Sequence, residues 1–424
     1  MKKLIIPFIL LFQLFTSCDI IGLHEDNDDL DWSPIILTRA QESFVESGNK
    51  LAIRFLKESY PYNKGNSFLI SPLSLQRALG MAMTGAEGTT KAEIAEVLGF
   101  DCDDSDIVND YLKIILDGIV NGDKKNISFH NADMMLFNNK YFNHIDNNFI
   151  TKIERSYDAF SDKLDFSKQS SVDKVNEWAK SKTEGLISNL FSSYSPYVYV
   201  YLISTMSFDG KWKYSFNTKF TAPGCFFKNN GETIITDMMK QTGEFVCLDY
   251  AFDGFSAASI PYGNGCFSMN IIVPHSTNGI EEIINKLDND LFQSIATSEK
   301  YKNVTISIPK FETETTLNKL DSVLFNMGIK AAFSPKTADF TKIAPRPDSV
   351  FFNGGSFQKN YIKINESGSI AASATVLPVG IFSSSGVDTG PVASKSLVAD
   401  RTFLYYITDN RTGVILFIGI YNGN

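Results

Sequence analysis

A run of small residues near the C-terminus constrains this chain more than any other feature. Glu366 and Ser367 are followed by Gly368–Thr375, which contains only Gly, Ser, Ala and Thr apart from Ile370. The run has neither helical nor strict two-residue periodicity, and the residues after it, as far as Val392, are rich in Ser, Gly, Pro and Val. A connection of this length in a compact domain is usually functional or disordered.

The same small side chains also suit a second conformation. Ala and Ser can enter a packed sheet without overpacking it, and in a strand every N–H and C=O can pair with a neighbour. Gly368 supplies a flexible pivot ahead of the run. The segment can therefore lie outside the fold in one state and form a strand in another.

Composition predicts one large globular domain. The chain has 424 residues, of which 43% are hydrophobic, and includes 34 Phe and 17 Tyr, which is ample for a large core. No Pro-rich or charge-rich linker interrupts the interior, so we expect a single domain over residues 35–424. The net charge of −9 and the lack of a basic stripe argue against nucleic acid as a partner.

Residues 1–18 have the layout of a targeting segment. Lys2 and Lys3 precede an apolar stretch, Leu4–Phe15, that is too short for a membrane-spanning helix. The small residues before Cys18 resemble a bacterial lipobox, which would make Cys18 the lipidated N-terminus of the mature protein; simple secretion is the alternative. Residues 19–34 read as an acidic tether with little to bury.

Sequence motifs give no support for an enzyme or a metal centre. The chain has no GxSxG or HExxH motif and no phosphate loop, and its four His have no neighbours that suggest a triad. The cysteines after Cys18 form no CxxC pair and lack zinc spacing, so separate, mostly buried thiols are expected and no cofactor is predicted. These cysteines are Cys102, Cys225, Cys247 and Cys266.

Periodicity and turn signals place the main elements. Helices are expected at 33–60 (ended by Pro61), 91–98, 101–123, 144–157, 170–183 and 280–296. Strands are expected at 127–137, 198–208 and 350–365, with a hairpin over 403–421.

Several of these segments, in the same order, resemble the serpin family. Residues 66–100, "NSFLISPLSLQRALGMAMTGAEGTTKAEIAEVLGF", are similar to its strand, SPxS helix and GAxGxT turn. "VNEWAKSKTEGLISNLF" (175–191) and "VTISIPKFETETTLNKLDSVLFNMGIKAAFSPKTADFTKI" (304–343) are similar to further family segments. The resemblance covers roughly 35–424 and implies an α+β fold with three β-sheets, about nine helices and an exposed reactive loop at about 366–399.

The resemblance implies a protease inhibitor and not an enzyme. In this family a target serine protease attacks the loop and becomes acylated, and the cut loop then inserts into the main sheet and traps the protease. Cysteine proteases also form an acyl intermediate and remain open as targets. The residues that match the family's hinge are Glu366, Gly368, Ser369, Ala371, Ala372, Ser373 and Ala374.

Counting along the loop predicts the reactive bond. The seventeenth residue counted from Glu366 is Phe382, so the cut falls before Ser383 and favours a chymotrypsin-like protease. A frame shifted by one would put Ile381 or Ser383 before the bond and favour elastase-like or subtilisin-like enzymes. A strand of 17 residues spans about 56 Å at roughly 3.3 Å each, which sets the distance that a trapped protease would travel.

Two further clusters are implied by the resemblance. At the breach, where the loop begins to insert, Trp212, Thr221 and Lys310 match the family, and Lys310 is expected to pair with Glu366. At the shutter, under the centre of the sheet, Ser71 and Ser74 match. Ser204 and Gln358 stand where the family has Asn and His, and a Ser–Gln hydrogen bond could replace that pair.

Departures from the pattern leave an alternative open. Ile370 stands where a Glu is usual, and Pro378 lacks an N–H for the inserted strand. A non-inhibitory serpin-fold binding protein, or a substrate that is merely cleaved, is the alternative. The acidic segment 101–123 argues against activation by glycosaminoglycans. We expect a monomer, held by its lipid at a bacterial cell envelope and facing the periplasm or the outside.

Overall fold

The computed structural model describes Trp32 and residues 34–423, except for 101–103, 186, 188, 195–196, 252, 346–349, 351, 353–355 and 370–394. The α-helices in this part of the chain are α1 (Arg39–Asn63), α2 (Pro72–Gly85), α3 (Gly88–Leu98), α4 (Ser105–Val120), α5 (Asn147–Tyr157), α6 (Gln169–Lys182), α7 (Ile280–Lys286), α8 (Asn289–Ala296) and α9 (Leu320–Asn326).

The strands fall into two connected groups. One group contains β2 (Ile127–Asn138), β3 (Phe160–Leu164), β4 (Val200–Lys211), β10 (Phe311–Leu317), β11 (Gln358–Asn365) and β12 (Gly368–Ser369). The other contains β1 (Phe68–Ile70), β5 (Ala222–Phe227), β6 (Thr233–Tyr250), β7 (Phe255–Tyr262), β8 (Phe267–Pro274), β9 (Tyr301–Pro309), β13 (Ser396–Val398), β14 (Phe403–Asp409) and β15 (Ile415–Tyr421).

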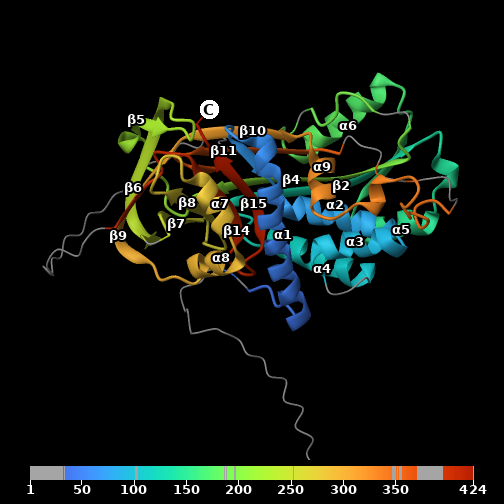
Figure 1. Ribbon diagram of the computed structural model, residues 1–424, viewed down its shortest axis with the longest axis horizontal. Helices are drawn as coiled ribbons and strands as arrows, with labels where there is room; N and C mark the ends of the chain where they lie inside the picture. The colour runs from blue at the N-terminus through green and yellow to red at the C-terminus, as the bar shows by residue number, and fades with distance from the viewer. Residues whose placement is uncertain are drawn as a thin grey trace, which may run out of the picture.

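The six-stranded sheet carries the candidate site. Its order is β10-β11-β12-β4-β2-β3, so the two-residue strand β12 lies between β11 and β4. The helix α6 packs on one face of β2 and β4, and α2 packs on the other (Figure 1). Both faces of these strands are covered, which is why 198–208 reads as a nearly continuous apolar run.

The second group of strands is continuous through β6. The first half of this long strand pairs with β5 and β9, and its second half pairs with β7. The two smaller sheets of the expected three-sheet fold therefore share the strand β6 and form one nine-stranded sheet, in which eight strands follow one path and β5 pairs with β6 off that path. The predicted α+β fold is confirmed, and the hairpin expected at 403–421 is β14–β15.

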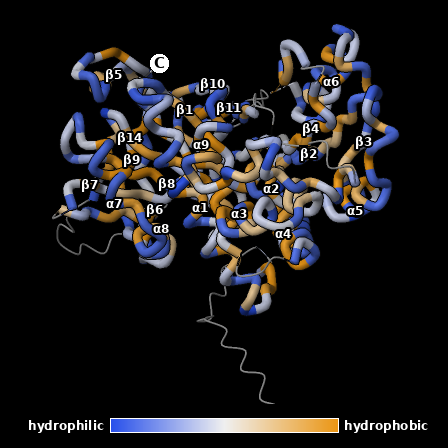
Figure 2. Tube along the Cα trace, turned by 45° about the vertical axis from the view of Figure 1, so that its right-hand side comes forward, coloured by the Kyte–Doolittle hydropathy of each residue, from blue (hydrophilic) through white to orange (hydrophobic). Residues whose placement is uncertain are grey.

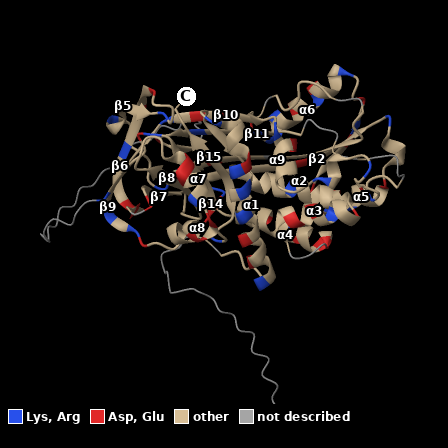
Figure 3. Ribbon diagram, in the orientation of Figure 1, with Lys and Arg blue, Asp and Glu red and all other residues tan. Residues whose placement is uncertain are grey.

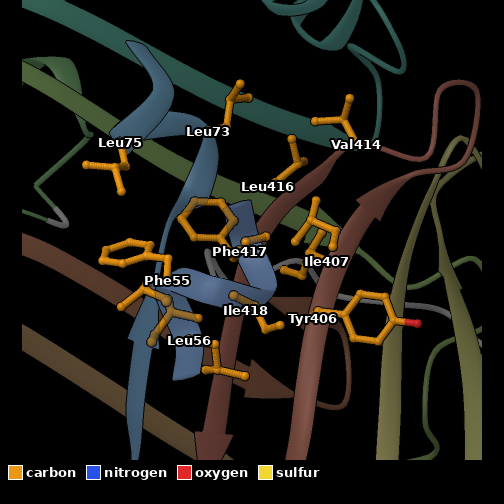
Figure 4. Close-up of a cluster of buried hydrophobic side chains, with 14 of the residues drawn as sticks. Phe55, Leu56, Leu73, Leu75, Tyr406, Ile407, Val414, Leu416, Phe417 and Ile418 are labelled. Carbon is orange, nitrogen blue, oxygen red and sulfur yellow. The ribbon is translucent and has the colours of Figure 1, made fainter. Parts of the chain in front are cut away.

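The main hydrophobic core lies where α1 and α2 meet β14 and β15. Figure 4 shows Phe55 and Leu56 of α1 and Leu73 of α2 facing Ile407 and Phe417 of the hairpin. Hydrophobic residues run along the central strands, with hydrophilic residues on the outer turns (Figure 2). This core packs the hairpin against α1 and α2.

Local signals explain how the helices start. Thr38 and Gln41 form a capping box at α1, and the Ser71 hydroxyl accepts a hydrogen bond from the Ser74 amide at the start of α2. Pro72 occupies the first turn of α2, where its missing N–H costs nothing. Gly99 ends α3 in the left-handed conformation, with φ of 73°.

Some predicted boundaries were wrong. Pro61 does not end α1 but lies in its last turns, where only a terminal hydrogen bond is lost. The single helix expected at 280–296 is two helices, because Leu287 leaves the helix and the Asp288 side chain caps α8 through the Leu291 amide. The strand expected from residue 350 begins only at Gln358.

The structure bears on two further predictions, the separate and mostly buried thiols and the acidic segment 101–123. Cys225 is exposed, Cys247 and Cys266 are buried, and all three are free; Cys102 lies outside the described residues. The helix α4 presents acidic side chains, as Figure 3 shows. Over the described residues, no helix combines the length and the apolar character that crossing a membrane requires.

Candidate functional site

The chain reverses direction sharply at the start of the predicted loop. The Asn365 side-chain oxygen accepts hydrogen bonds from the amides of Ser367 (2.9 Å) and Gly368 (3.2 Å), which forms a turn over Glu366 and Ser367. The next two residues form β12, which is antiparallel to both of its neighbours. The predicted exposed loop of 366–399 is therefore corrected at both ends, since 368–369 and 396–398 are strands.

Gly368 is required for this close approach. Its φ is +147°, and a Cβ built on it would lie 2.0 Å from the Gly210 carbonyl oxygen and 2.7 Å from the Lys211 Cα. Both atoms belong to the backbone of β4 and cannot move aside as a side chain can. Only glycine can therefore sit at this position of the inserted strand.

Glu366 is fixed on the side of the turn. Its carboxylate accepts a hydrogen bond from the Thr221 hydroxyl (2.9 Å) and forms an ion pair with Lys310 (3.2 Å), as the sequence predicted. Partial burial acts to raise the pKa of Glu366, but hydrogen bonds from its own amide, Thr221 and Lys310 outweigh burial and lower it. The carboxylate is thus charged at neutral pH and holds the base of the loop.

Trp212 binds the other side of the same turn. Its indole N–H donates to the Asn365 carbonyl (2.9 Å), and its amide donates to the Ser367 carbonyl (3.0 Å). The indole is buried and stacks on the Tyr262 ring, with centroids 4.3 Å apart and planes 13° apart. The predicted breach residues Trp212, Thr221 and Lys310 therefore meet around Glu366–Ser367.

Ser369 is the deepest hinge residue that the structure describes. It is fully buried, and its backbone lies between Gly210 and Ile364. Its hydroxyl is 2.8 Å from the Tyr262 hydroxyl. The first two loop residues are thus already packed as a strand.

The shutter residues meet in a different pattern from the predicted one. The Gln358 amide makes two hydrogen bonds with the Ser71 backbone, accepting from its N–H (2.9 Å) and donating to its carbonyl (2.8 Å). The Ser204 hydroxyl has no hydrogen-bond partner among the described residues, so the predicted Ser204–Gln358 bond is absent. The Ser74 hydroxyl donates to the Ser204 carbonyl (2.9 Å) and ties α2 to β4.

A gap separates β4 from β11 beyond β12. Within the described residues no ladder joins the two strands directly, and β12 pairs only with Gly210 and Lys211 of β4. A cavity of about 220 Å³ lies further along, lined by residues of both strands and of α2, among them Ser74, Leu79, Leu202, Ser204 and Gln358. The edge of β4 that faces this gap offers backbone groups to a further strand.

The remaining predicted site residues lie outside the part of the chain that the structure describes. Ala371, Ala372, Ser373 and Ala374 of the hinge, Ile381, Phe382 and Ser383 at the predicted bond, and Cys18 lie outside the described residues. Ile370 and Pro378 lie outside them as well.

Sequence reasoning missed two residues that shape the site. Tyr262 belongs to another strand group, and its contact with Ser369 has no signature in the sequence. Gly210 had a signal, since a glycine inside an apolar strand pattern often marks a close backbone approach. Its carbonyl oxygen is the atom that a side chain at Gly368 would strike.

Comparisons with known proteins agree with this arrangement. Iripin-3 of Ixodes ricinus is 28% identical over 400 residues, which cover 92% of this chain and 98% of that protein. Plasminogen activator inhibitor 1 of Neovison vison is 25% identical over 417 residues, covering 96% of this chain and 98% of that protein. The native-state crystal structure of Tengpin, a thermophilic serpin, superposes with a TM-score of 0.80 at 25% identity and covers 92% of this chain and 96% of its own.

The sequence profile described as serpin (serine protease inhibitor) matches residues 46–423, nearly the whole described chain. Members of this family are generally protease inhibitors that act on serine proteases, and not enzymes. The two-residue strand β12 between β11 and β4 accords with the match. The chain therefore belongs to the serpin family.

Proposed function

We propose that this protein inhibits serine proteases by a suicide-substrate reaction in which its cut loop becomes a strand between β4 and β11. The observation that carries this proposal is the position of β12, since Gly368 and Ser369 already lie as a strand between β11 and β4. Insertion would extend β12 along the edge of β4 that faces β11, and each added residue could form backbone hydrogen bonds on both sides.

The residues that would follow β12 suit this movement. In a continued strand, Ala371 and Ser373 would face the same side as Ser369, while Ile370, Ala372 and Ala374 would face the other. All but Ile370 are small, so they can be buried without overpacking. Pro378 would lose one ladder bond at a cost of about 1 kcal/mol, which a strand of this length tolerates.

The proposed target is a chymotrypsin-like serine protease. Counting from Glu366 puts Phe382 before the cut bond, and an aromatic side chain suits an apolar specificity pocket. The catalytic serine would attack the Phe382 carbonyl, and the chain from Ser383 onward would leave as an amine. The acyl-enzyme ester would then be carried along the sheet before water reaches it.

We also propose that the inhibitor acts at a cell surface. Lys2, Lys3 and the apolar stretch that follows them precede Cys18 in the order of a lipoprotein signal, and residues 19–34 would serve as a tether. A lipid on Cys18 would place the loop where secreted proteases reach it. Mass spectrometry of the mature N-terminal peptide from a bacterial host should show a diacylglycerol adduct on Cys18; an unmodified N-terminus downstream of Cys18 would overturn the anchor.

The function is tested by incubating residues 19–424 with chymotrypsin and separating the products on a denaturing gel. We expect an adduct that survives detergent, together with a released peptide that begins at Ser383. Phe382→Arg should move adduct formation from chymotrypsin to trypsin, while Phe160→Arg, the same substitution at an exposed position of the outer strand β3, should leave the preference unchanged. If chymotrypsin-, elastase- and trypsin-like enzymes all cleave the protein without forming an adduct, the protein is a substrate or a binding protein and not an inhibitor of these enzymes.

A further inference from the structure

Tyr262 connects Ser369 of the hinge to the other group of strands. It ends β7, in the other strand group, and is fully buried. Its ring is held on two sides, stacked on Trp212 and edge-on to Phe208 with ring centroids 5.0 Å apart. The position of the phenol oxygen is therefore fixed by packing and does not depend on the loop.

The phenol has one partner, and that partner belongs to the loop. The Tyr262 and Ser369 oxygens are 2.8 Å apart, and this is the one hydrogen bond that either hydroxyl makes among the described residues. Both residues are fully buried, so in this arrangement each hydroxyl is shielded from water. Burial also raises the pKa of Tyr262, which keeps the phenol protonated. Withdrawal of Ser369 from the sheet would leave a buried phenol without a partner.

We propose that Tyr262 is a positioning residue that sets the resting position of the reactive loop. Through the Ser369 hydroxyl it holds two loop residues in the sheet before any protease arrives. Those two residues are thereby withheld from an attacking protease, and insertion starts from a strand that is already nucleated. The role of Tyr262 in trapping a protease rests on the proposed inhibitory function. Its role in holding the hinge in the sheet is independent of that function.

Loss of the phenol should have two opposite effects on the reaction. A released hinge gives the protease a longer loop to bind, so we expect Tyr262→Phe to be cleaved about 3- to 10-fold faster, the range that one hydrogen bond supports. Insertion must then begin without β12 already in the sheet. It should therefore be slower, and a larger share of the acyl-enzyme complexes should be hydrolysed before the protease is trapped. The number of inhibitor molecules consumed for each protease should therefore rise.

The resting position is tested by amide hydrogen exchange, read by mass spectrometry on residues 19–424 without protease. Tyr262→Phe keeps the ring stack and removes only the hydroxyl, and Ser369→Ala removes its partner. We expect either change to speed exchange in the peptide that contains Gly368 and Ser369 by about 3- to 10-fold. Because both variants break the same bond, the double variant should exchange no faster than the single ones.

Two controls separate a released hinge from a damaged fold. Gly368→Ala should speed exchange in the same peptide, because its Cβ would strike the Gly210 carbonyl. The amides of α5 (Asn147–Tyr157), a helix that packs on α2, α4 and β3, should be unchanged in every variant. Unchanged hinge exchange in Tyr262→Phe, or effects that add in the double variant, would overturn the anchoring.

Reaction with chymotrypsin then decides the role in trapping. Altered exchange together with an unchanged cleavage rate and unchanged inhibitor consumption would show that the resting position does not matter to the reaction. A wild-type protein that forms no adduct with any protease would remove the inhibitory function, while the exchange measurements would still decide whether Tyr262 anchors the loop.

Discussion

At the scale of single residues, the charged carboxylate of Asp209 on β4 lowers the stability of the folded protein. Partial burial raises the pKa of Asp209 to about 6, and the nearby Glu184 carboxylate adds to the rise while Lys211 opposes it. Because the folded-state pKa lies above the unfolded one, the native state gains stability below about pH 4 and loses it as the pH rises through 6. The charged form therefore weakens the native sheet at neutral pH.

Replacing Asp209 by Asn should remove this cost. We expect Asp209→Asn to raise the free energy of unfolding by about 1 kcal/mol at pH 7.5, a figure reduced for solvent screening because Asp209 is only partly buried, and by less at pH 5.0. Urea denaturation at the two pH values measures it. Asp237→Asn on the exposed part of β6 should have no such effect, and an equal gain for Asp209→Asn at both pH values would contradict the assignment.

Residue-level contacts show where the sequence was sufficient and where it was not. Glu366 and Lys310 could be paired in advance, since each matches a family position and opposite charges attract over several ångströms. The Ser204–Gln358 bond was wrong because the Gln358 side chain is long enough to reach the Ser71 backbone and satisfy both of its amide groups there. Such a choice between partners depends on tertiary distances that sequence spacing does not contain.

At the scale of elements, the turn between β11 and β12 is held by two unequal contacts. Thr221 is partly buried and donates to a charged carboxylate, so Thr221→Val should lower the free energy of unfolding by about 1.5 kcal/mol. Lys310 is 38% exposed, and solvent screens its ion pair, so Lys310→Met should cost only about 0.5 kcal/mol. Urea denaturation at pH 7.5 compares the two variants.

The same turn has a predictable pH dependence. The pKa of Glu366 is lowered in the folded state, so its contacts stabilise the protein above the unfolded-state pKa and lose their effect as the pH falls through the folded-state value. The cost of both substitutions should therefore shrink below about pH 4. Lys363→Met, which breaks the exposed pair with Glu312 on the neighbouring strands, is the matched control, and a larger cost for Lys310→Met than for Thr221→Val would contradict the ranking.

The sequence predicted the positions of helices and strands better than the breaks between neighbouring elements. Apolar runs and periodicity identified β2, β4 and α6 within a few residues, because burial on a fixed face imposes the pattern. The break between α7 and α8 was missed, although Asp288 three residues before Leu291 is a capping signal. The short strand β12 was not predicted, because two residues are too few to show a two-residue periodicity. Their pairing depends on the space between β4 and β11, which the sequence does not reveal.

At the scale of the whole molecule, the described residues fill the strand position between β4 and β11 only at β12. The sheet closes around β12 for only two residues, and a cavity lies further along the gap. Filling the gap with about ten residues of the cut loop would add on the order of 10 kcal/mol in backbone hydrogen bonds alone. At roughly 0.8 kcal/mol per degree for a domain of this size, this corresponds to an increase of about 10 °C in the unfolding temperature.

Cleavage should therefore stabilise the protein instead of weakening it. We expect wild-type protein cut in its loop to unfold about 10 °C or more above the native form in a thermal scan. Ser369→Arg cannot bury its side chain beside Tyr262, so its cut form should unfold near its own native temperature and give cleavage without trapping. Thr316→Arg adds the same charge on the exposed edge of β10 and should behave as wild type. If cut wild-type protein gains no stability, the gap between β4 and β11 does not receive the loop, and a stable protease adduct would need another cause.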